Sequence, residues 1–526
     1  MISRRTMIGG AAGAVAAGVL TTAAAACGGA DRSGGSSPGP RALVTGGEVR
    51  GRWENGQAVF RGISYAQAPV GSLRFAAPAA PTLWTGVRDA VEFGPPAPQT
   101  SVPATSDDWL TVNVWTPNLK AVGLPVMVWI HGGGYVSSSS SEPDYDGAPL
   151  ASSGVVVVSL NYRLGVEGFA HILGAPANRG LLDQTAALDW VKRNIAAFGG
   201  DPSRVTVFGE SAGAGSITAL LTMPAAAGLF HRAIIESSVA GLYFTPELAT
   251  DIGTTYAAQL GLQPTKADLA ALPPARLVEA MTQLQASGAP PRWGRVGALL
   301  FSTVFWPVVD GTVLPQAPLH AIAQGASRGI DLVVGHTSEE WRYFIVAAGG
   351  LDTITPEQSD QALRTLSPGP DGPNAYRQGY PNADHRQLYE LVHSDWALRM
   401  PSLRIAEAHS AARGTSYLYE YRYNHTPDGA GHGTELPLVF DTLATASGTR
   451  LFGTDPAPEV RTLGEEMRRA WTNFAIHGDP GWPAYHPDGQ PTRLFDTPTT
   501  TADYPETASQ RIWADFPFDP LPLTST

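Results

Sequence analysis

The chain has 526 residues, of which 43% are hydrophobic, and its formal net charge is -12. This length and composition are ordinary for a large globular enzyme, and beyond the amino-terminal segment every apolar run is too short or too interrupted to span a bilayer. We expect no nucleic-acid partner, because nucleic acids bind where Lys and Arg cluster and the sequence has no such cluster.

The amino terminus has the pattern of an export signal. Arg4 and Arg5 precede a weakly hydrophobic run rich in Ala and Gly, which predicts a twin-arginine signal over residues 1–27 rather than a membrane anchor. The run ends at Cys27 in a setting that resembles a bacterial lipobox, although Ala24 replaces the usual Leu. We therefore expect an exported, extracytoplasmic protein, either anchored to the membrane by a lipid on Cys27 or cleaved nearby and secreted. Because Cys27 is the only cysteine, an intramolecular disulfide is excluded.

A short linker separates this signal from the rest of the chain. Residues 28–41 are mainly Gly, Ser, Pro and Asp, a composition that has nothing to pack and predicts a flexible tether. The sequence after the tether has no internal repeat and no second linker of similar length. Residues 42–526 are therefore predicted to form a single domain.

Along this domain, short β-branched runs alternate with helical patterns of apolar residues. Strands are predicted over Leu124 to Ile130, Val155 to Tyr162, Arg204 to Phe208, Asp331 to Gly335 and Ser416 to Tyr423, and helices over Leu182 to Phe198, Ala212 to Met223 and Val460 to His477. Such alternation indicates an α/β fold, with a mostly parallel sheet and helices on both of its faces. In folds of this kind the chemistry is found beyond the carboxyl ends of the strands.

A G-x-S-x-G motif lies between one of these strands and the following helix. Residues 209–213 read Gly-Glu-Ser-Ala-Gly, and the strand, turn and helix around them are the context of a nucleophile elbow. Glycines at both ends allow the helix to pass close to the strand. We therefore predict that Ser211 presents its hydroxyl above the sheet as a nucleophile, in preference to the alternative of a purely structural turn.

A glycine-rich loop follows the strand that ends at Ile130. A serine nucleophile needs hydrogen-bond donors already directed at the oxyanion that forms on its substrate. The loop begins at His131 and continues with three glycines, whose backbone N–H groups can approach a substrate without a Cβ in the way. We predict the amides of Gly133, Gly134 and Ala212 as these donors, and we expect His131 only to order the loop.

Taken with these motifs, several further blocks make the chain resemble the type-B carboxylesterase/lipase family. The blocks are Phe60 to Ala66, Pro69 to Gly71 and Leu73 to Phe75 near the start of the domain, Phe198 to Pro202 before the elbow, and Trp471 to Pro480 near the end. The resemblance covers essentially everything after the tether. It implies the α/β-hydrolase fold with inserted cap regions, and hydrolysis of carboxylic esters through an acyl-enzyme, with neither a metal nor an organic cofactor.

The resemblance also implies a glutamate as the acid of a catalytic triad, in a segment after a late strand. Two adjacent residues, Glu339 and Glu340, occupy that place, and the register from Gly335 favours Glu340. Asp310 is the competing carboxylate, but it precedes a glycine in a setting typical of a structural turn.

The base of the triad is predicted from the histidine loop of the family. His432 lies in Gly-His-Gly-Thr-Glu after the strand that ends at Tyr423, and His425 is the alternative. With this choice Ser211, Glu340 and His432 follow one another in the chain order expected of the fold.

Other positions match the family in part. Glu210 and Ser237 correspond to family residues that help to order the site, and Ser237 is expected to hydrogen-bond the acid. Ala97 and Trp109 stand where many relatives have a cysteine pair that brackets a longer loop. That loop recognises quaternary ammonium groups in cholinesterases, so we do not expect choline esters as substrates.

These features predict an ester hydrolase whose partner is a small to medium neutral ester, with membrane contact only through Cys27. Two alternatives stay open at this point: a catalytically silent binding or adhesion protein of the same fold, and a specialised lipase or aryl-ester esterase. Retention of the predicted triad and glycine loop argues against the silent protein. The choice of substrate is expected to reside in cap regions near Phe244 to Trp306 and Leu351 to Pro401. The sequence does not predict the oligomeric state.

Overall fold

The strands that build the centre of the molecule are apolar on both faces, as a sheet covered by helices on each side requires. The computed structural model describes residues 39–102, 106–299 and 303–524, so the predicted signal, Cys27 and most of the predicted tether lie outside the described residues. Residues Pro40–Thr526 form one compact unit.

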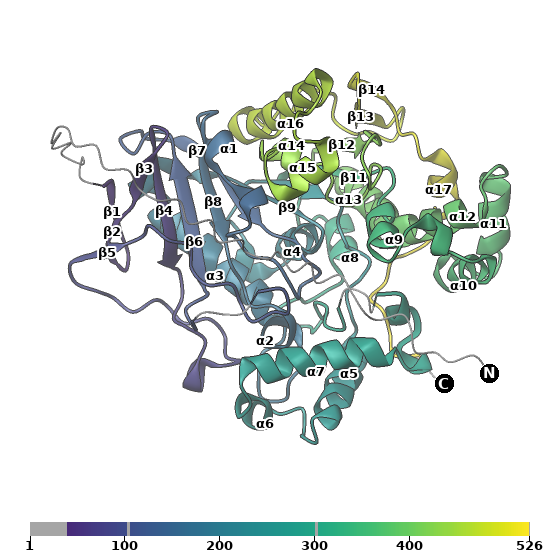
Figure 1. The fold of residues 1–526 in the computed structure, drawn as a ribbon, viewed down its shortest axis with the longest axis horizontal. Helices are drawn as coiled ribbons and strands as arrows, with labels where there is room; N and C mark the ends of the chain where they lie inside the picture. The colour runs from purple at the N-terminus through teal and green to yellow at the C-terminus, as the bar shows by residue number, and fades with distance from the viewer. Residues whose placement is uncertain (1–38, 103–105, 300–302, 525–526) are drawn as a thin grey trace, which may run out of the picture. The chain divides into compact units, whose positions relative to one another are not determined.

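Within the described residues, one eleven-stranded sheet runs in the order β14-β13-β12-β11-β10-β9-β7-β8-β6-β4-β3 (Figure 1). Its strands are β3 (Arg52–Glu54), β4 (Gln57–Ser64), β6 (Thr111–Thr116), β7 (Leu124–Ile130), β8 (Val156–Leu160), β9 (Gly200–Glu210), β10 (Arg232–Glu236), β11 (Asp331–Thr337), β12 (Ser416–Tyr421), β13 (Pro491–Phe495) and β14 (Thr500–Asp503). Neighbouring strands from β8 to β13 pair in parallel. Both edges of the sheet pair antiparallel, which the strand patterns alone did not predict.

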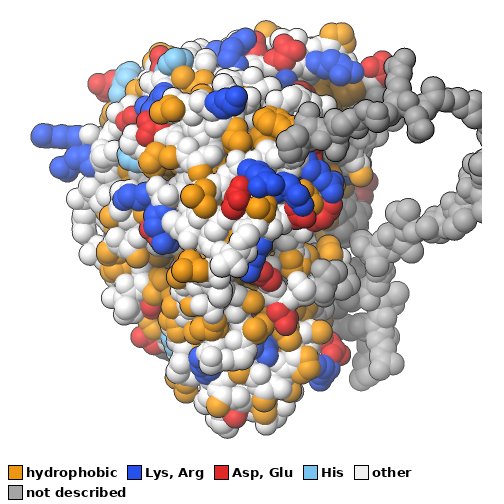
Figure 2. Space-filling model, turned by 90° about the vertical axis from the view of Figure 1, so that its left-hand side faces the viewer, with side chains coloured by type: hydrophobic (Ala, Val, Ile, Leu, Met, Phe, Trp, Pro, Cys, Tyr) orange, Lys and Arg blue, Asp and Glu red, His pale blue; other side chains and the backbone are white. Residues whose placement is uncertain are grey.

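A second, smaller sheet joins β1 (Arg41–Val44), β2 (Gly47–Arg50) and β5 (Val87–Asp89). This sheet is at the left of Figure 1, the side that faces the viewer in Figure 2. Figure 2 shows acidic and basic side chains mixed on that side, and three ion pairs there join Arg41 to Glu48, Arg50 to Asp89 and Arg52 to Glu92. Exposed pairs of this kind contribute little to stability.

Helices cover the large sheet and extend beyond its ends (Figure 1). They are α1 (Ala148–Ala151), α2 (Gly165–Phe169), α3 (Arg179–Asn194), α4 (Ala212–Leu220), α5 (Pro246–Gln259), α6 (Lys266–Ala270), α7 (Pro274–Ser287), α8 (Pro318–Ala323), α9 (Arg342–Ala347), α10 (Pro356–Leu366), α11 (Gly372–Gly379), α12 (His385–Ser394), α13 (Met400–Ala411), α14 (Leu436–Val439), α15 (Ala446–Phe452), α16 (Pro458–His477) and α17 (Thr507–Ile512). In the described part of the chain, no helix is long and apolar enough to cross a membrane.

The two faces of the sheet pack against different helices because side chains alternate along each strand. On β7, Met127 and Trp129 belong to a core shared with α14 and α16, whereas Val128 and Ile130 belong to the larger core shared with α3, α4 and α13. The sheet is therefore a buried middle layer. This architecture is that of the α/β-hydrolase fold, as predicted.

The predicted elements agree with the observed ones in kind, and several differ at their ends. Strand β9 begins at Gly200, before the β-branched run, because that residue already pairs with Leu124 of β7. Helix α4 ends at Leu220 rather than Met223, and α3 gives way to a 3-10 turn, Ile195–Phe198. Both regions predicted as caps are helical: α5 to α7 occupy one, and α10 to α12 occupy the other.

Candidate active site

The residues predicted to carry chemistry come together beyond the carboxyl ends of the central strands. Ser211 directly follows β9, the glycine-rich loop follows β7, and Ser237 follows β10. Glu340 and His432 come from the segments after β11 and β12. These five strands run in parallel next to one another, so their carboxyl ends bring together residues that are more than 200 positions apart in the sequence.

The turn at Ser211 has the strained backbone of a nucleophile elbow. Ser211 has φ 57° and ψ -120°, and its amide donates to the carbonyl oxygen of Glu236 over 2.9 Å. A Cβ on Gly209 would lie 2.6 Å from the carbonyl oxygen of Ile130, and one on Gly213 would clash with that same atom. The two glycines are therefore required because α4 passes directly against β7.

The glycine-rich loop lies against this turn. A Cβ on Gly132 would stand 2.7 Å from Glu210 Oε2 and 3.2 Å from Ser211 Cβ. Gly133 and Gly134 both have positive φ, 93° and 60°, a backbone shape that strongly favours glycine. Gly133 and Gly134 line the same cavity as Ser211, and Ala212 is the first residue of α4, where N–H groups lack helical partners.

His131, the residue expected to order the loop, is packed at the start of it. Its ring is buried, stacks on Tyr162 at 4.5 Å between ring centroids, and contacts the carbonyl oxygen of Gly132 through Nδ1 at 2.9 Å. The Tyr162 hydroxyl donates to the His131 carbonyl over 2.8 Å. Burial lowers the pKa of His131 to about 4. The ring is therefore neutral at physiological pH, and it contributes packing contacts rather than a charge.

The residues predicted as acid and base are in direct contact. His432 Nδ1 lies 2.7 Å from Glu340 Oε2, and the other oxygen of Glu340 accepts from the Thr337 amide over 2.9 Å. On the far side of the ring, His432 Nε2 lies 3.0 Å from Glu210 Oε1. The imidazole is thus held between two carboxylates, one of them next to Ser211 in the sequence.

The competing residues have other positions. Glu339 accepts from the Ala430 amide over 2.9 Å and pairs with Arg342 at 3.0 Å. The carboxylate of Asp310 accepts from backbone amides that follow it, including that of Leu314 at 2.8 Å, and so forms a turn. His425 is exposed and contacts the ring of Tyr423.

These contacts set the charges of the site. Burial alone would lower the pKa of His432, but the charge of Glu210 beside the ring, followed by the hydrogen bond and charge of Glu340, raises it well above its ordinary value of 6.5. Burial alone would raise the pKa of Glu340, yet His432, Ser237 and the Thr337 amide together lower it. The protonated imidazole is therefore stabilised on both sides.

Two further carboxyl groups lie beneath the site, and the sequence patterns did not indicate them. Burial raises the pKa of Glu236 to about 8, although the Trp471 indole donates to it over 3.1 Å. Burial, and then the charges of Glu210, Glu236 and Glu340, raise the pKa of Glu435 well above its ordinary range. Glu236 is thus mostly protonated at neutral pH, and burial disfavours the charged form of Glu435 as well.

A cavity of about 670 Å³ opens over these residues and is lined by Gly133, Gly134, Glu210, Ser211 and His432. Apolar and aromatic side chains form most of its remaining wall: Val136, Val239, Leu242, Met281, Leu299, Trp306, Trp341, Tyr343, Phe344, Ala397, Leu398, Leu436, Pro437 and Leu451. Several come from the two predicted cap regions. A cavity of this size and lining fits a small organic molecule.

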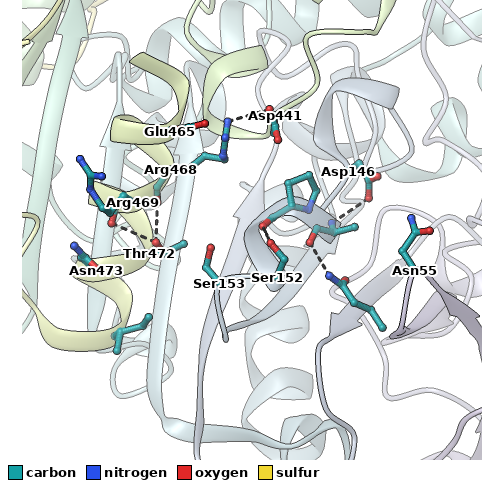
Figure 3. A pocket seen from close by; sticks show the side chains of 14 residues that line it. Asn55, Asp146, Ser152, Ser153, Asp441, Glu465, Arg468, Arg469, Thr472 and Asn473 are labelled. Carbon is teal, nitrogen blue, oxygen red and sulfur yellow. Dashed lines mark hydrogen bonds and ion pairs between the residues drawn. The ribbon is translucent and has the colours of Figure 1, made fainter. Parts of the chain in front are cut away.

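A second hollow of about 740 Å³ lies elsewhere, between α1 and α16 (Figure 3). Its lining is mostly polar, and Figure 3 shows Arg468 directed at Asp441, 3.1 Å away. Ser152 also lines it, but the hydroxyl donates to the Pro149 carbonyl over 2.6 Å, and no histidine is among its lining residues as described. This hollow therefore lacks a nucleophile with a base beside it.

Comparison with known proteins agrees with this geometry. A model of the carboxylesterase family matches residues 39–513. The chain is 38% identical over 487 residues to the para-nitrobenzyl esterase of Bacillus subtilis, covering 88% of this chain and 96% of that protein. It is 35% identical over 464 residues to the fumonisin B1 esterase of Sphingopyxis macrogoltabida, covering 82% of each.

Solved structures give the same result. A para-nitrobenzyl esterase structure superposes with a TM-score of 0.78 at 38% identity, covering 90% of this chain and 99% of the other. The structure of a Geobacillus stearothermophilus carboxylesterase at pH 6.2 superposes with a TM-score of 0.81 at 35% identity, with the same coverage. The chain belongs to the carboxylesterase family, and it is a carboxylic ester hydrolase.

Proposed function

We propose that this ester hydrolase acts through Ser211 as nucleophile, His432 as base and Glu340 as acid, with the amides of Gly133, Gly134 and Ala212 as oxyanion donors. The observation that carries the proposal is the position of His432 between Glu340 and Glu210, in the cavity lined by Ser211. Hydrogen bonds between a nucleophile and its base are often long in a free enzyme and tighten when substrate binds.

In the first half-reaction, the Ser211 oxygen bonds to the ester carbonyl carbon while His432 Nε2 takes the hydroxyl proton. The carbonyl electron pair moves onto oxygen, and the three amides donate hydrogen bonds to the oxyanion that forms. The C–O bond to the alcohol then breaks, and the alcohol leaves with the proton from His432. In the second half-reaction, water repeats the sequence on the acyl-enzyme and frees the acid product. Glu340 and Glu210 stabilise the imidazolium present between the proton transfers.

The substrate proposed is a small to medium neutral ester with an apolar or aromatic part. The support is the wall of the cavity, where Trp306, Phe344 and Leu398 are among many apolar side chains, and the two carboxylates that face His432. A negatively charged acyl group would meet Glu210 beside the nucleophile. A panel of para-nitrophenyl esters that varies acyl length and charge tests this, and equal rates for an anionic and a neutral acyl group of one size would contradict it.

A covalent probe tests the roles directly. A fluorophosphonate reacts with a serine hydroxyl only when that serine is activated, and peptide mass spectrometry then identifies the residue that carries the adduct. We expect the adduct on Ser211, abolished in His432→Ala and retained in His425→Ala. An adduct on another serine, or unchanged labelling of His432→Ala, would contradict the proposal.

We further propose that the protein is exported and lipidated at Cys27. The support is the sequence alone: the Arg4-Arg5 pair, the Ala-rich run and the single cysteine at its end. Mass spectrometry of the mature amino terminus is the test, with a diacylglyceryl-modified Cys27 as the expected result. An unmodified terminus that begins elsewhere would contradict lipidation and leave export in place.

A further inference from the structure

The turn that carries Glu340 contributes residues to two cavities. On one side, Trp341 lines the active-site cavity. On the other side, Ser338 and Glu339 line a separate cavity of about 450 Å³. A segment bordered by open space on both sides is held by fewer packing contacts than one inside a core. Hydrogen bonds made by its backbone therefore help to fix its position.

One helical segment supplies two of these bonds, one at each end of the turn. The Arg399 guanidinium donates through Nη1 to the carbonyl oxygen of Ser338 over 2.9 Å. The Ser394 hydroxyl accepts from the amide of Trp341 over 3.0 Å. Glu340 thus lies between two points at which its own backbone is tied to the same stretch of chain.

The spacing of these two residues follows from an irregular helix. Residues Asp395–Arg399 form a π-helical segment between α12 and α13, in which the Met400 amide donates to Asp395, five residues back. Pro401 follows and has no N–H to donate to Ala397, so the regular ladder cannot continue there. A π-segment inside an α-helix is rare and frequently lies at a functional site. Here, Ala397 and Leu398 of the same segment line the active-site cavity.

Arg399 is itself rigidly held. Its side chain is buried and pairs with Asp395 at 2.7 Å and with Glu506 at 3.2 Å, and it donates to the hydroxyl of Ser509 over 3.1 Å. A buried guanidinium with its donors engaged in this way is a fixed point rather than a mobile side chain. The Ser338 carbonyl is therefore attached to a rigid network that reaches α17.

We propose that Ser394 and Arg399 are positioning residues for catalysis, which hold the turn at residues 338–341 so that the Glu340 carboxylate meets His432. This inference rests on the proposed role of Glu340 as the acid. Neither residue touches the substrate or the reacting atoms in this scheme. Their effect on the rate passes entirely through Glu340, and that is the property by which a test can separate them from residues that merely stabilise the fold.

The test is a double-mutant cycle on para-nitrophenyl acetate hydrolysis. Ser394→Ala removes the hydroxyl that accepts from the Trp341 amide. Small misplacements of catalytic groups lower the rate strongly, so we expect kcat to fall about 10- to 100-fold. KM should stay within about twofold of the wild-type value. Ser394→Thr keeps a hydroxyl and should restore most of the rate. In a Glu340→Gln background, the same Ser394→Ala change should cost almost nothing more, because the two residues act as one unit.

Arg399→Lys serves as the second variant, because it keeps the buried positive charge but loses the planar set of guanidinium N–H donors. We expect its effect on kcat to be non-additive with Glu340→Gln as well. Matched controls on α13 are Ser410→Ala and Arg404→Lys: Ser410 contacts the hydroxyl of Ser416 and Arg404 donates to the carbonyl of Trp513. Both should keep kcat, and Tm measurements show whether stability is comparable.

The outcomes separate the two proposals. Equal costs of Ser394→Ala in both backgrounds, or no cost in either, would overturn the positioning role while leaving Glu340 as the acid. If Glu340→Gln itself keeps full activity, the proposed acid role fails, and the positioning role fails with it.

Discussion

The elbow at residues 209–213 and the turn at residues 338–341 each carry one residue of the proposed triad, but they are held in different ways. The elbow is fixed by its own glycines, since α4 presses against β7 and a side chain at Gly213 would clash with the Ile130 carbonyl. The turn is fixed by distant side chains, including Ser394 and Arg399, more than 50 residues away in the sequence. A local sequence motif therefore predicts the elbow, whereas no local motif predicts the turn.

The largest expected effect comes from the elbow and the proposed base. Ser211→Ala and His432→Ala should each lower kcat by about 10⁶-fold, and the double mutant should be scarcely worse, because nucleophile and base act as one unit. Folding should survive, since both side chains lie above the sheet rather than in its core. Steady-state kinetics with circular dichroism checks this, and full activity of pure Ser211→Ala would show that another residue is the nucleophile.

At the turn, Glu340→Gln should lower kcat by about 10⁴-fold, less than removal of the nucleophile, because the amide disturbs the orientation and charge of His432 but leaves Ser211 in place. Comparing the loss of kcat in Glu340→Gln with the loss in Ser211→Ala shows how much of the rate depends on the acid. A loss equal to that of Ser211→Ala would contradict this expectation, and would mean that His432 cannot act as a base without the Glu340 carboxylate.

This difference explains what the sequence could predict. The order of strands and helices, the elbow and the glycine loop follow from local patterns, and the structure has them where expected. The position of His432 required a family resemblance, and the choice between Glu339 and Glu340 depended on register alone. The contacts of Glu210 with His432 and of Arg399 with Ser338 join distant segments, so no local pattern indicates them. Pro401 within a helical run was the one available signal of the π-segment.

The glycine loop offers a smaller test of the elbow. A Cβ on Gly132 would come within 2.7 Å of Glu210 Oε2, so Gly132→Ala should push the loop away from Ser211. Loss of an oxyanion donor costs about 10²- to 10³-fold in kcat, and we expect a loss in this range. Gly329→Ala is the control, because open space surrounds that position. Equal rates for the two variants would show that the loop does not need its close approach.

The charges around the base predict the pH dependence. His432 must be neutral to accept the Ser211 proton, and Glu210 and Glu340 raise its pKa well above 6.5. The value of kcat/KM should therefore fall as the pH drops through this raised pKa, with the acid limb above pH 6.5. In Glu210→Gln the larger raising influence is lost, so the limb should move to lower pH. A limb that stays in place would show that Glu210 does not stabilise the imidazolium.

The smallest effect is expected at Glu339, the neighbour of the proposed acid. Its carboxylate accepts from the Ala430 amide over 2.9 Å, two residues before His432, and pairs with Arg342 at 3.0 Å. In Glu339→Gln the amide oxygen can still accept from Ala430, and Arg342 keeps its pair with Glu390 at 2.8 Å. Partly exposed ion pairs contribute little.

We therefore expect Glu339→Gln to lower kcat by no more than about threefold, the cost of one weakened ion pair at the edge of the site. Glu339→Ala removes the acceptor as well, and should cost more than Glu339→Gln because the histidine loop loses one of its ties. Parallel kcat measurements on the two variants and on Glu340→Gln decide the register. If Glu339→Gln loses as much activity as Glu340→Gln is expected to lose, the acid is Glu339, and the assignment of the acid to Glu340 is wrong by one residue.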